Sequence, residues 1–218
     1  MAQGIDSEYD CTQYAHQIAE KYTFVGRYYR MPPPYSHYPT LTRLEAQALS
    51  AAGLSLASIW EYISGSQGRI ESLNYNAGLN EGGRAYKQAL ALPQPDGTPI
   101  YFAVDEGYDP QKPEYAGPID DYFKGVNDAF AQAAGPGNQP KYAIGVYGPG
   151  AVCAWLKGKG RVASTWLANA KLWPGYSYAD WDVKQGFRDP ALPFGHDIDE
   201  CKPSGGLWQI PNAAANVA

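Results

Sequence analysis

The sequence predicts an α/β protein that folds as a single (β/α)8 barrel. This prediction leaves room for irregular helices late in the chain. Three observations carry this prediction. Short apolar runs typical of strands alternate with segments of helical spacing, which implies right-handed βαβ units and a parallel sheet. Eight candidate strands fall within 218 residues, a number that suits a compact barrel. No long linker or low-complexity segment divides the chain, so residues 1–218 are expected to form one domain.

The predicted strands are short runs rich in aromatic and β-branched residues, bounded by turn-forming residues. Six of them are clear: Gly4–Asp6, Phe24–Tyr29, Leu54–Tyr62, Ile100–Asp105, Ala143–Gly148 and Thr165–Asn169. Two weaker candidates, Trp181–Gln185 and His196–Asp199, complete the eight.

Helical segments lie between these strands. Thr42 and Glu45 stand at capping-box spacing and Gly53 is a natural C-terminal stop, which together predict a helix between them. Apolar side chains at helical spacing predict a second helix over 119–130. Further helices are expected over 12–21, 79–92 and 149–156. The alternative fold, a doubly wound open sheet, is disfavoured because no GxGxxG or Walker sequence supports a nucleotide site.

Composition and charge narrow the classes of function. The net charge is -5 with no basic run, which argues against nucleic acid and anionic membranes as partners. No apolar stretch reaches the ~18 residues of a membrane span. The three cysteines have no metal-binding spacing, and no motif calls for a cofactor. The 18 tyrosines and 6 tryptophans suit sugar or peptide binding, with core packing as the alternative.

Strand parity predicts that carboxylates gather at one mouth of the barrel. Successive side chains of a strand face opposite sides, so Asp105 faces the interior while Glu106 points toward the rim. The same reasoning brings Asp6, Tyr28, Glu61, Tyr147 and Asp199 to that mouth. We expect the catalytic groups among four acids: Asp6, Glu61, Asp105 and Glu106. Converging carboxylates repel, so at least one pKa should rise, as glycoside hydrolysis requires. Taken singly, each acid fits a turn or helix cap equally well.

Other side chains are candidates for holding a substrate. Tyr28, Tyr147 and Asp199 flank the predicted acids, and Gln185 ends a late strand, where its amide could hydrogen-bond a ligand. Trp166 is predicted to face inward and, with Trp208, to offer a stacking platform, although core packing is the usual place of a single Trp. His196 stands beside two aspartates, but without a second convergent His no metal site is expected.

Several segments in order also resemble a known family. These are "GIDS", "FVGRYY", "PIYFAVDEG", "IGVYG", "TWLANA" and the late "WDVKQG…DIDE". Together they are similar to the glycoside-hydrolase-like TIM-barrel domain of unknown function, which is distantly similar to the Chalaropsis-type lysozymes of glycoside hydrolase family 25. Those lysozymes carry Asp on the first strand, matched by Asp6, and Asp-x-Glu on the fourth, where this chain has Ala103 and Asp105. Asp199 matches a late-strand Asp.

The resemblance implies a protein that acts on cell-wall polysaccharide, with peptidoglycan as the first candidate substrate and Asp105 as the expected general acid. Because the first Asp of the fourth-strand pair is Ala103, the alternative is a non-catalytic glycan-binding or cell-wall-associated module that kept the cleft. We expect a monomer that is secreted or attached to the cell wall. No signal peptide is recognisable at the N-terminus, so an intracellular protein is the alternative.

Two cysteines follow strands that would be neighbours in a closed barrel. Cys11 comes after the first predicted strand and Cys201 after the eighth. A Cys11–Cys201 disulfide would join the two ends of the sheet and would imply an oxidising compartment.

Overall fold

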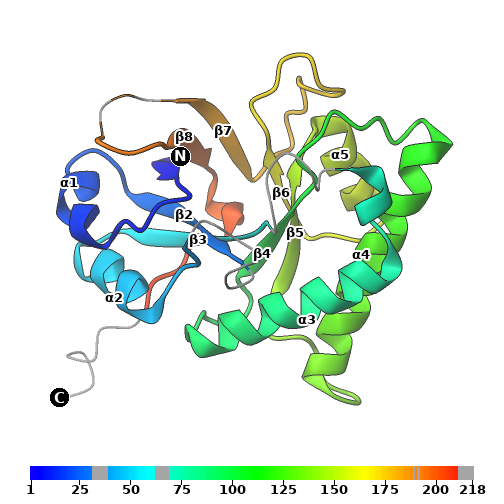
Figure 1. The fold of residues 1–218 in the computed structure, drawn as a ribbon, viewed down its shortest axis with the longest axis horizontal. Coiled ribbons are helices and arrows are strands. Elements are labelled where there is room, and N and C mark those ends of the chain that lie inside the picture. The colour runs from blue at the N-terminus through cyan, green and yellow to red at the C-terminus, as the bar shows by residue number, and fades with distance from the viewer. Residues whose placement is uncertain (31–38, 62–68, 189, 191, 211–218) are drawn as a thin grey trace.

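The computed structural model describes residues 1–30, 39–61, 69–188, 190 and 192–210, and it confirms the predicted barrel (Figure 1). Eight strands close in chain order. They are β1 Ala2–Asp6, β2 Phe24–Tyr29, β3 Ser55–Trp60, β4 Pro99–Ala103, β5 Ala143–Gly148, β6 Ser164–Leu167, β7 Val183–Arg188 and β8 Asp197–Cys201.

The helices cover two sides of the barrel, and all the predicted segments are found. They are α1 Ala15–Ala19, α2 Arg43–Ala51, α3 Tyr75–Ala91, α4 Pro113–Ala134 and α5 Gly150–Gly158. Figure 1 shows α1 and α2 on one side and α3, α4 and α5 on the other. Thr42 caps α2 by accepting a hydrogen bond from the Glu45 amide at 3.1 Å. No helix of the described residues is long and apolar enough to cross a membrane.

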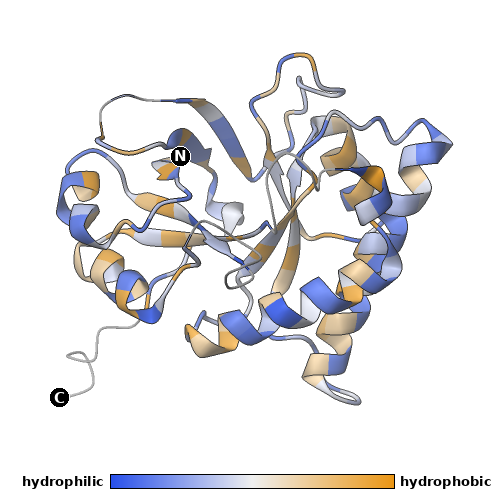
Figure 2. Cartoon of the chain, viewed as in Figure 1, coloured by the Kyte–Doolittle hydropathy of each residue, from blue (hydrophilic) through white to orange (hydrophobic). Residues whose placement is uncertain are grey.

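The last two strands depart from the regular barrel pattern. Strands β1 to β7 pair in parallel, but β8 runs antiparallel to both of its neighbours, β7 and β1. The expectation of an all-parallel sheet is therefore wrong at this point. A parallel crossover needs about a dozen residues or more, and only residues 189–196 separate β7 from β8. Residues 168–182, between β6 and β7, hold no helix. Figure 2 shows the contrast between apolar β4 and β5 and polar β7.

Aromatic rings fill the barrel interior, as strand parity predicts. The inner cluster contains Phe24, Tyr28, Ala57, Ile59, Tyr101, Trp166, Val183 and Cys201. Glycines on neighbouring strands make room for these rings. A Cβ atom on Gly4 would lie 2.4 Å from the Phe24 ring, and one on Gly26 would lie 2.7 Å from Trp166. These inward positions are therefore glycine because a ring occupies the space a side chain would need.

The predicted disulfide is not present: Cys11 and Cys201 are both free and buried, as is Cys153. The direction of β8 explains why. Because β8 is antiparallel, Cys201 pairs with Ala2 at the start of β1. Cys11 follows the opposite end of that strand. The two thiols thus belong to opposite ends of the barrel.

A buried ion pair fixes the loop that follows β1. The Arg27 guanidinium donates to Glu45 Oε1 at 2.6 Å and to Oε2 at 3.1 Å, and both side chains are fully buried. Arg27 Nη1 also donates to the Ser7 carbonyl at 2.6 Å, and the Cys11 amide donates to Glu45 Oε1 at 2.8 Å. The Glu45 carboxylate therefore anchors the β1–α1 loop, instead of closing the capping box.

Candidate active site

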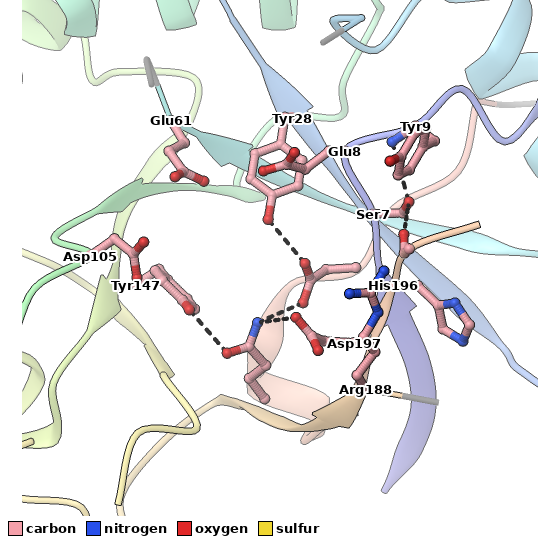
Figure 3. A pocket seen from close by; sticks show the side chains of 13 residues that line it. Ser7, Glu8, Tyr9, Tyr28, Glu61, Asp105, Tyr147, Arg188, His196 and Asp197 are labelled. Atoms are coloured by element: carbon pink, nitrogen blue, oxygen red, sulfur yellow. Dashed lines mark hydrogen bonds between the residues drawn. The ribbon is translucent and has the colours of Figure 1, made fainter. Parts of the chain in front are cut away.

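A pocket of about 410 Å³ lies at the mouth where the parallel strands end (Figure 3). It brings together six of the side chains predicted from the sequence: Asp6, Tyr28, Glu61, Asp105, Tyr147 and Gln185. Figure 3 shows Glu61 and Asp105 on one side, facing Asp197 and Arg188 on the other. The pocket is thus walled by carboxyl groups from strands far apart around the barrel.

Asp6 is held rigidly at the end of β1. It is 5% exposed, and Tyr28 Oη donates to its Oδ1 at 2.9 Å. Gln185 Nε2 donates to Asp6 Oδ2 at 3.0 Å and to Asp197 Oδ2 at 3.3 Å, while Tyr147 Oη donates to Gln185 Oε1 at 3.0 Å. Burial and the nearby Asp197 charge raise the pKa of Asp6 to about 6, against the lowering effect of these hydrogen bonds. Asp6 is therefore mostly ionised at neutral pH and fixed in one orientation.

Glu61 and Asp105 form the facing wall. Burial, followed by the Asp105 charge, raises the pKa of Glu61 to about 8, although Arg30 acts in the opposite direction. Burial and then the Glu106 and Glu8 charges raise the pKa of Asp105. At neutral pH the pocket therefore holds a protonated carboxyl group, on Glu61, and an ionised one, on Asp6.

The position of Glu61 follows from the register of its strand. Trp60 of β3 pairs with Phe102 of β4, and Ile59 pairs with Tyr101, whose ring is inside the barrel. Continuing this register by one residue places Glu61 level with Ala103, with both facing inward. A carboxyl group from β3 thus lies beside the place on β4 where Ala103 provides none.

Asp199 lies deeper than predicted. Because β8 is antiparallel, Asp197 pairs with Asp6 at the mouth, whereas Asp199 pairs with Gly4 farther inside. Asp199 is fully buried and accepts a hydrogen bond from Trp166 Nε1 at 3.1 Å. Burial and the Asp6 charge raise its pKa well above the ordinary value. Asp199 therefore lies buried beneath the pocket, and Asp197 takes the position at the mouth that was expected for Asp199.

Three further candidates lie outside the pocket lining. Trp166 is fully buried in the barrel interior, and Trp208 is 3% exposed with its Nε1 donating to Ser58 Oγ at 3.0 Å. The stacking-platform expectation is wrong for this pair, because both rings are core. Glu106 is exposed and does not line the pocket, unlike its neighbour Asp105, so its expected place among the catalytic acids is not supported.

The sequence reasoning missed several lining residues on the loops. Ser7, Glu8 and Tyr9 follow Asp6 directly, and Arg188 and Gly195 flank the turn between β7 and β8. The β7–β8 connection is too short for a parallel crossover. Recognising this would have predicted an antiparallel β8, and with it Arg188, Gly195 and Asp197 at the mouth. Among the described residues, no group of three or more His, Cys, Asp or Glu side chains is arranged to hold a metal ion.

The closed barrel and the carboxyl-lined mouth define a glycoside hydrolase-like protein of the TIM-barrel class. Residues 15–199 match the family described as "Rv2525c-like, glycoside hydrolase-like domain". The chain belongs to this family.

The chain is also similar to curated proteins and to solved structures. The chain is 33% identical over 127 residues to the uncharacterized protein YbfG of Bacillus subtilis, a match that covers 57% of this chain and 16% of YbfG. The Tat-secreted protein Rv2525c of Mycobacterium tuberculosis superposes with a TM-score of 0.76 at 21% identity, covering 95% of this chain and 98% of that one.

A more distant likeness links the fold to peptidoglycan enzymes. The modular autolysin LytC of Streptococcus pneumoniae, solved with a synthetic peptidoglycan ligand, superposes with a TM-score of 0.52 at 12% identity. That match covers 91% of this chain and 46% of LytC. At this identity the likeness shows a shared fold.

Proposed function

We propose that the protein is a glycoside hydrolase that cleaves a cell-wall polysaccharide, peptidoglycan or a related glycan. One observation carries the proposal: the pocket places Glu61, protonated at neutral pH, across from Asp6, which is mostly ionised. Glycoside hydrolysis needs one carboxylic acid to protonate the leaving oxygen and one carboxylate to act on the opposite face of the sugar. The autolysin LytC, which shares the fold, supports the substrate class.

In this proposal Glu61 and Asp105 work as a pair. Burial, reinforced by the Asp105 charge, raises the pKa of Glu61 to about 8, so Glu61 holds a proton at neutral pH. Asp6 is the opposing carboxylate, acting as nucleophile, base or electrostatic stabiliser of the positively charged transition state. Tyr28 and Gln185 orient Asp6, and Tyr147 orients Gln185.

Ala103 fits this scheme because Glu61 supplies a carboxyl group in place of the Asp that the lysozyme pattern has at position 103. Extending the register by one residue supports a Glu61 carboxyl group beside Ala103, so this wall would keep two acids, one just after β3 and one just after β4. This is the observation that favours an enzyme over a binding module that lost its catalytic groups.

We also propose that the protein works outside the cytoplasm as a monomer at the cell wall. The support is the fold shared with Rv2525c, which is described as Tat-secreted.

Reducing-end assays on peptidoglycan, chitin and α- and β-glucans test the proposal. Glu61→Gln, Asp105→Asn and Asp6→Asn should each lower turnover by about 10²–10⁴-fold. Glu114→Gln is the matched control on the exposed first turn of α4 and should keep full activity. The rate should be highest between about pH 6 and 8, rising as Asp6 ionises and falling as Glu61 loses its proton. Glycan binding without turnover in the wild type would instead identify the non-catalytic module.

A further inference from the structure

A second hollow of about 840 Å³ adjoins the site pocket. Three residues line both: Tyr9, Arg188 and Gly195. The two hollows therefore adjoin along these three residues, and we treat them together as one cleft that extends from the carboxylates past the β1–α1 loop toward the turn between β7 and β8. A cleft that continues past the reacting groups fits a polymer better than a small substrate.

Three aromatic side chains line the second hollow: Tyr9, Tyr14 and Phe194. Phe194 lies 4.9 Å from Tyr14 and 6.4 Å from Tyr9, measured between ring centroids. Tyr9 is 46% exposed, a large exposed fraction for a ring that already packs on a neighbour. Aromatic rings with an accessible apolar face and a polar edge suit the C–H faces and hydroxyls of a sugar. The second hollow is therefore suited to a further sugar unit of the same chain.

The junction between the hollows is tightly packed around Gly195. A Cβ atom there would lie 2.7 Å from Arg188 Nη2 and 3.2 Å from Tyr9 Cε2. The Ser7 hydroxyl donates a hydrogen bond to the Gly195 carbonyl at 2.8 Å. The Ser7 hydroxyl oxygen in turn accepts a hydrogen bond from the Tyr9 amide at 3.2 Å. The hydrogen bonds hold the β1–α1 loop against the β7–β8 connection, and the absence of a side chain on Gly195 leaves room for the Arg188 guanidinium at the junction.

Charge divides the cleft into two unequal parts. The site pocket is lined by the carboxyl groups of Asp6, Glu8, Glu61, Asp105 and Asp197. Arg188 brings a positive charge to the junction. Burial raises the pKa of Asp197 there, and the Arg188 charge acts in the opposite direction. An anionic substituent would be repelled over the carboxylates and attracted at Arg188. A neutral sugar ring is the group that the acidic part can accept.

We propose that the cleft binds an acidic glycan in one direction, with a carboxylate substituent held by Arg188 and the next sugar packed against Tyr9 and Phe194. This inference rests on the proposed function for the position of the scissile bond, and it adds the substrate class: a polymer whose sugars carry carboxylates. The Arg188 guanidinium suits the binding of a carboxylate, because two of its coplanar N–H groups can donate to the two carboxylate oxygens. Arg188 is then a specificity residue and takes no part in the proton transfers.

Calorimetric titration with two oligosaccharides of equal length tests the proposal. One is neutral chitohexaose, and the other alternates N-acetylglucosamine with N-acetylmuramic acid and keeps free lactyl carboxylates. The background variant is Glu61→Gln, so that binding is measured without the proposed proton donor. Arg188→Gln should weaken binding of the acidic ligand by about 10-fold or more and leave the neutral ligand within about 2-fold. Arg84→Gln, the same change on exposed α3, should alter neither.

Two more readouts separate a specific contact from a general loss of structure. Raising the salt concentration should weaken binding of the acidic ligand to the protein that keeps Arg188, because salt screens the charge. Its affinity should then approach that of the Arg188→Gln variant. Tyr9→Ala should weaken both ligands together. Equal losses for both ligands in Arg188→Gln, no loss for either, or no binding of the acidic ligand to the parent protein would overturn the proposal. If Arg188-dependent binding is found but the wild type cleaves no glycan, the proposed function fails and the assignment of the binding cleft stands.

Discussion

Replacing Glu45 with Ala should destabilise the protein by about 3–5 kcal/mol, because it leaves the fully buried Arg27 charge without its partner. The magnitude follows from what is lost: two charge-assisted hydrogen bonds, at 2.6 and 3.1 Å, and the acceptor of the Cys11 amide. For a chain of 218 residues this corresponds to a fall in the melting temperature of about 6–20 °C. Urea unfolding at pH 7, followed by tryptophan fluorescence, measures the change.

A double variant provides the control. Replacing Arg27 with Met and Glu45 with Leu removes both charges while keeping apolar volume, so it should recover most of the lost stability. A cost below about 1 kcal/mol for Glu45→Ala would refute the reasoning, since it would mean that the pair is exposed to water. Because Arg27 also holds the Ser7 carbonyl at 2.6 Å, the single variant should weaken glycan binding as well, at temperatures where it is still folded.

Three further predictions concern the site and the barrel interior. Burial raises the Glu61 pKa from 4.5 to about 8, so ionising Glu61 costs native stability as the pH rises through this range, and Glu61→Gln should be more stable than the wild type at pH 8 but not at pH 4. Gly26→Ala should cost about 1–3 kcal/mol and shift the emission of Trp166, because the new methyl group would meet that ring at 2.7 Å. Thiol titration of the non-reduced protein should find three free cysteines in denaturant and slow reaction in the native state, because all three are buried.

Each of these has a result that counts against it. A stability difference between Glu61→Gln and the wild type that is the same at pH 4 and pH 8 would mean that Glu61 keeps an ordinary pKa. An unchanged Trp166 spectrum in Gly26→Ala would place that ring elsewhere in the barrel. Finding only one free thiol in denaturant would mean that two cysteines are joined, as expected for a Cys11–Cys201 disulfide.

Alternation along the strands was enough to predict much of the site. Asp6, Glu61 and Asp105 were placed at the mouth from parity alone, because a strand has a fixed period of two and one face of each strand here is buried against helices. The glycines opposite the rings belong to the same pattern. Parity also directed Glu106 toward the rim, and the structure leaves it exposed and outside the pocket lining, although it was among the four acids expected to be catalytic.

Parity alone could not give strand direction or depth. Asp197 and Asp199 have the same parity, and only the antiparallel course of β8 decides that Asp197 reaches the mouth. The disulfide expectation failed for the same reason. The prediction of a tryptophan stacking platform was wrong for a different reason. Parity shows that Trp166 faces inward, but it does not show whether the barrel interior is open or filled. Tyr9 lies on a loop, which follows no period, and a register shift between Gln185 and Arg188 breaks the period at the end of β7, so only the three-dimensional structure could bring Tyr9 and Arg188 together.

The antiparallel β8 makes one wall of the cleft a single contiguous stretch of chain. Gln185, Arg188, Gly195 and Asp197 all belong to one β-hairpin, whereas a regular barrel would draw such residues from separate βα loops. Under the proposed function, the side chains that would set substrate preference on this side all lie within residues 183–201, a segment short enough to be exchanged as one unit. A hairpin transplanted from a relative would carry its own internal pairing with it, so ligand choice could be altered while β1 to β6 keep their sequence.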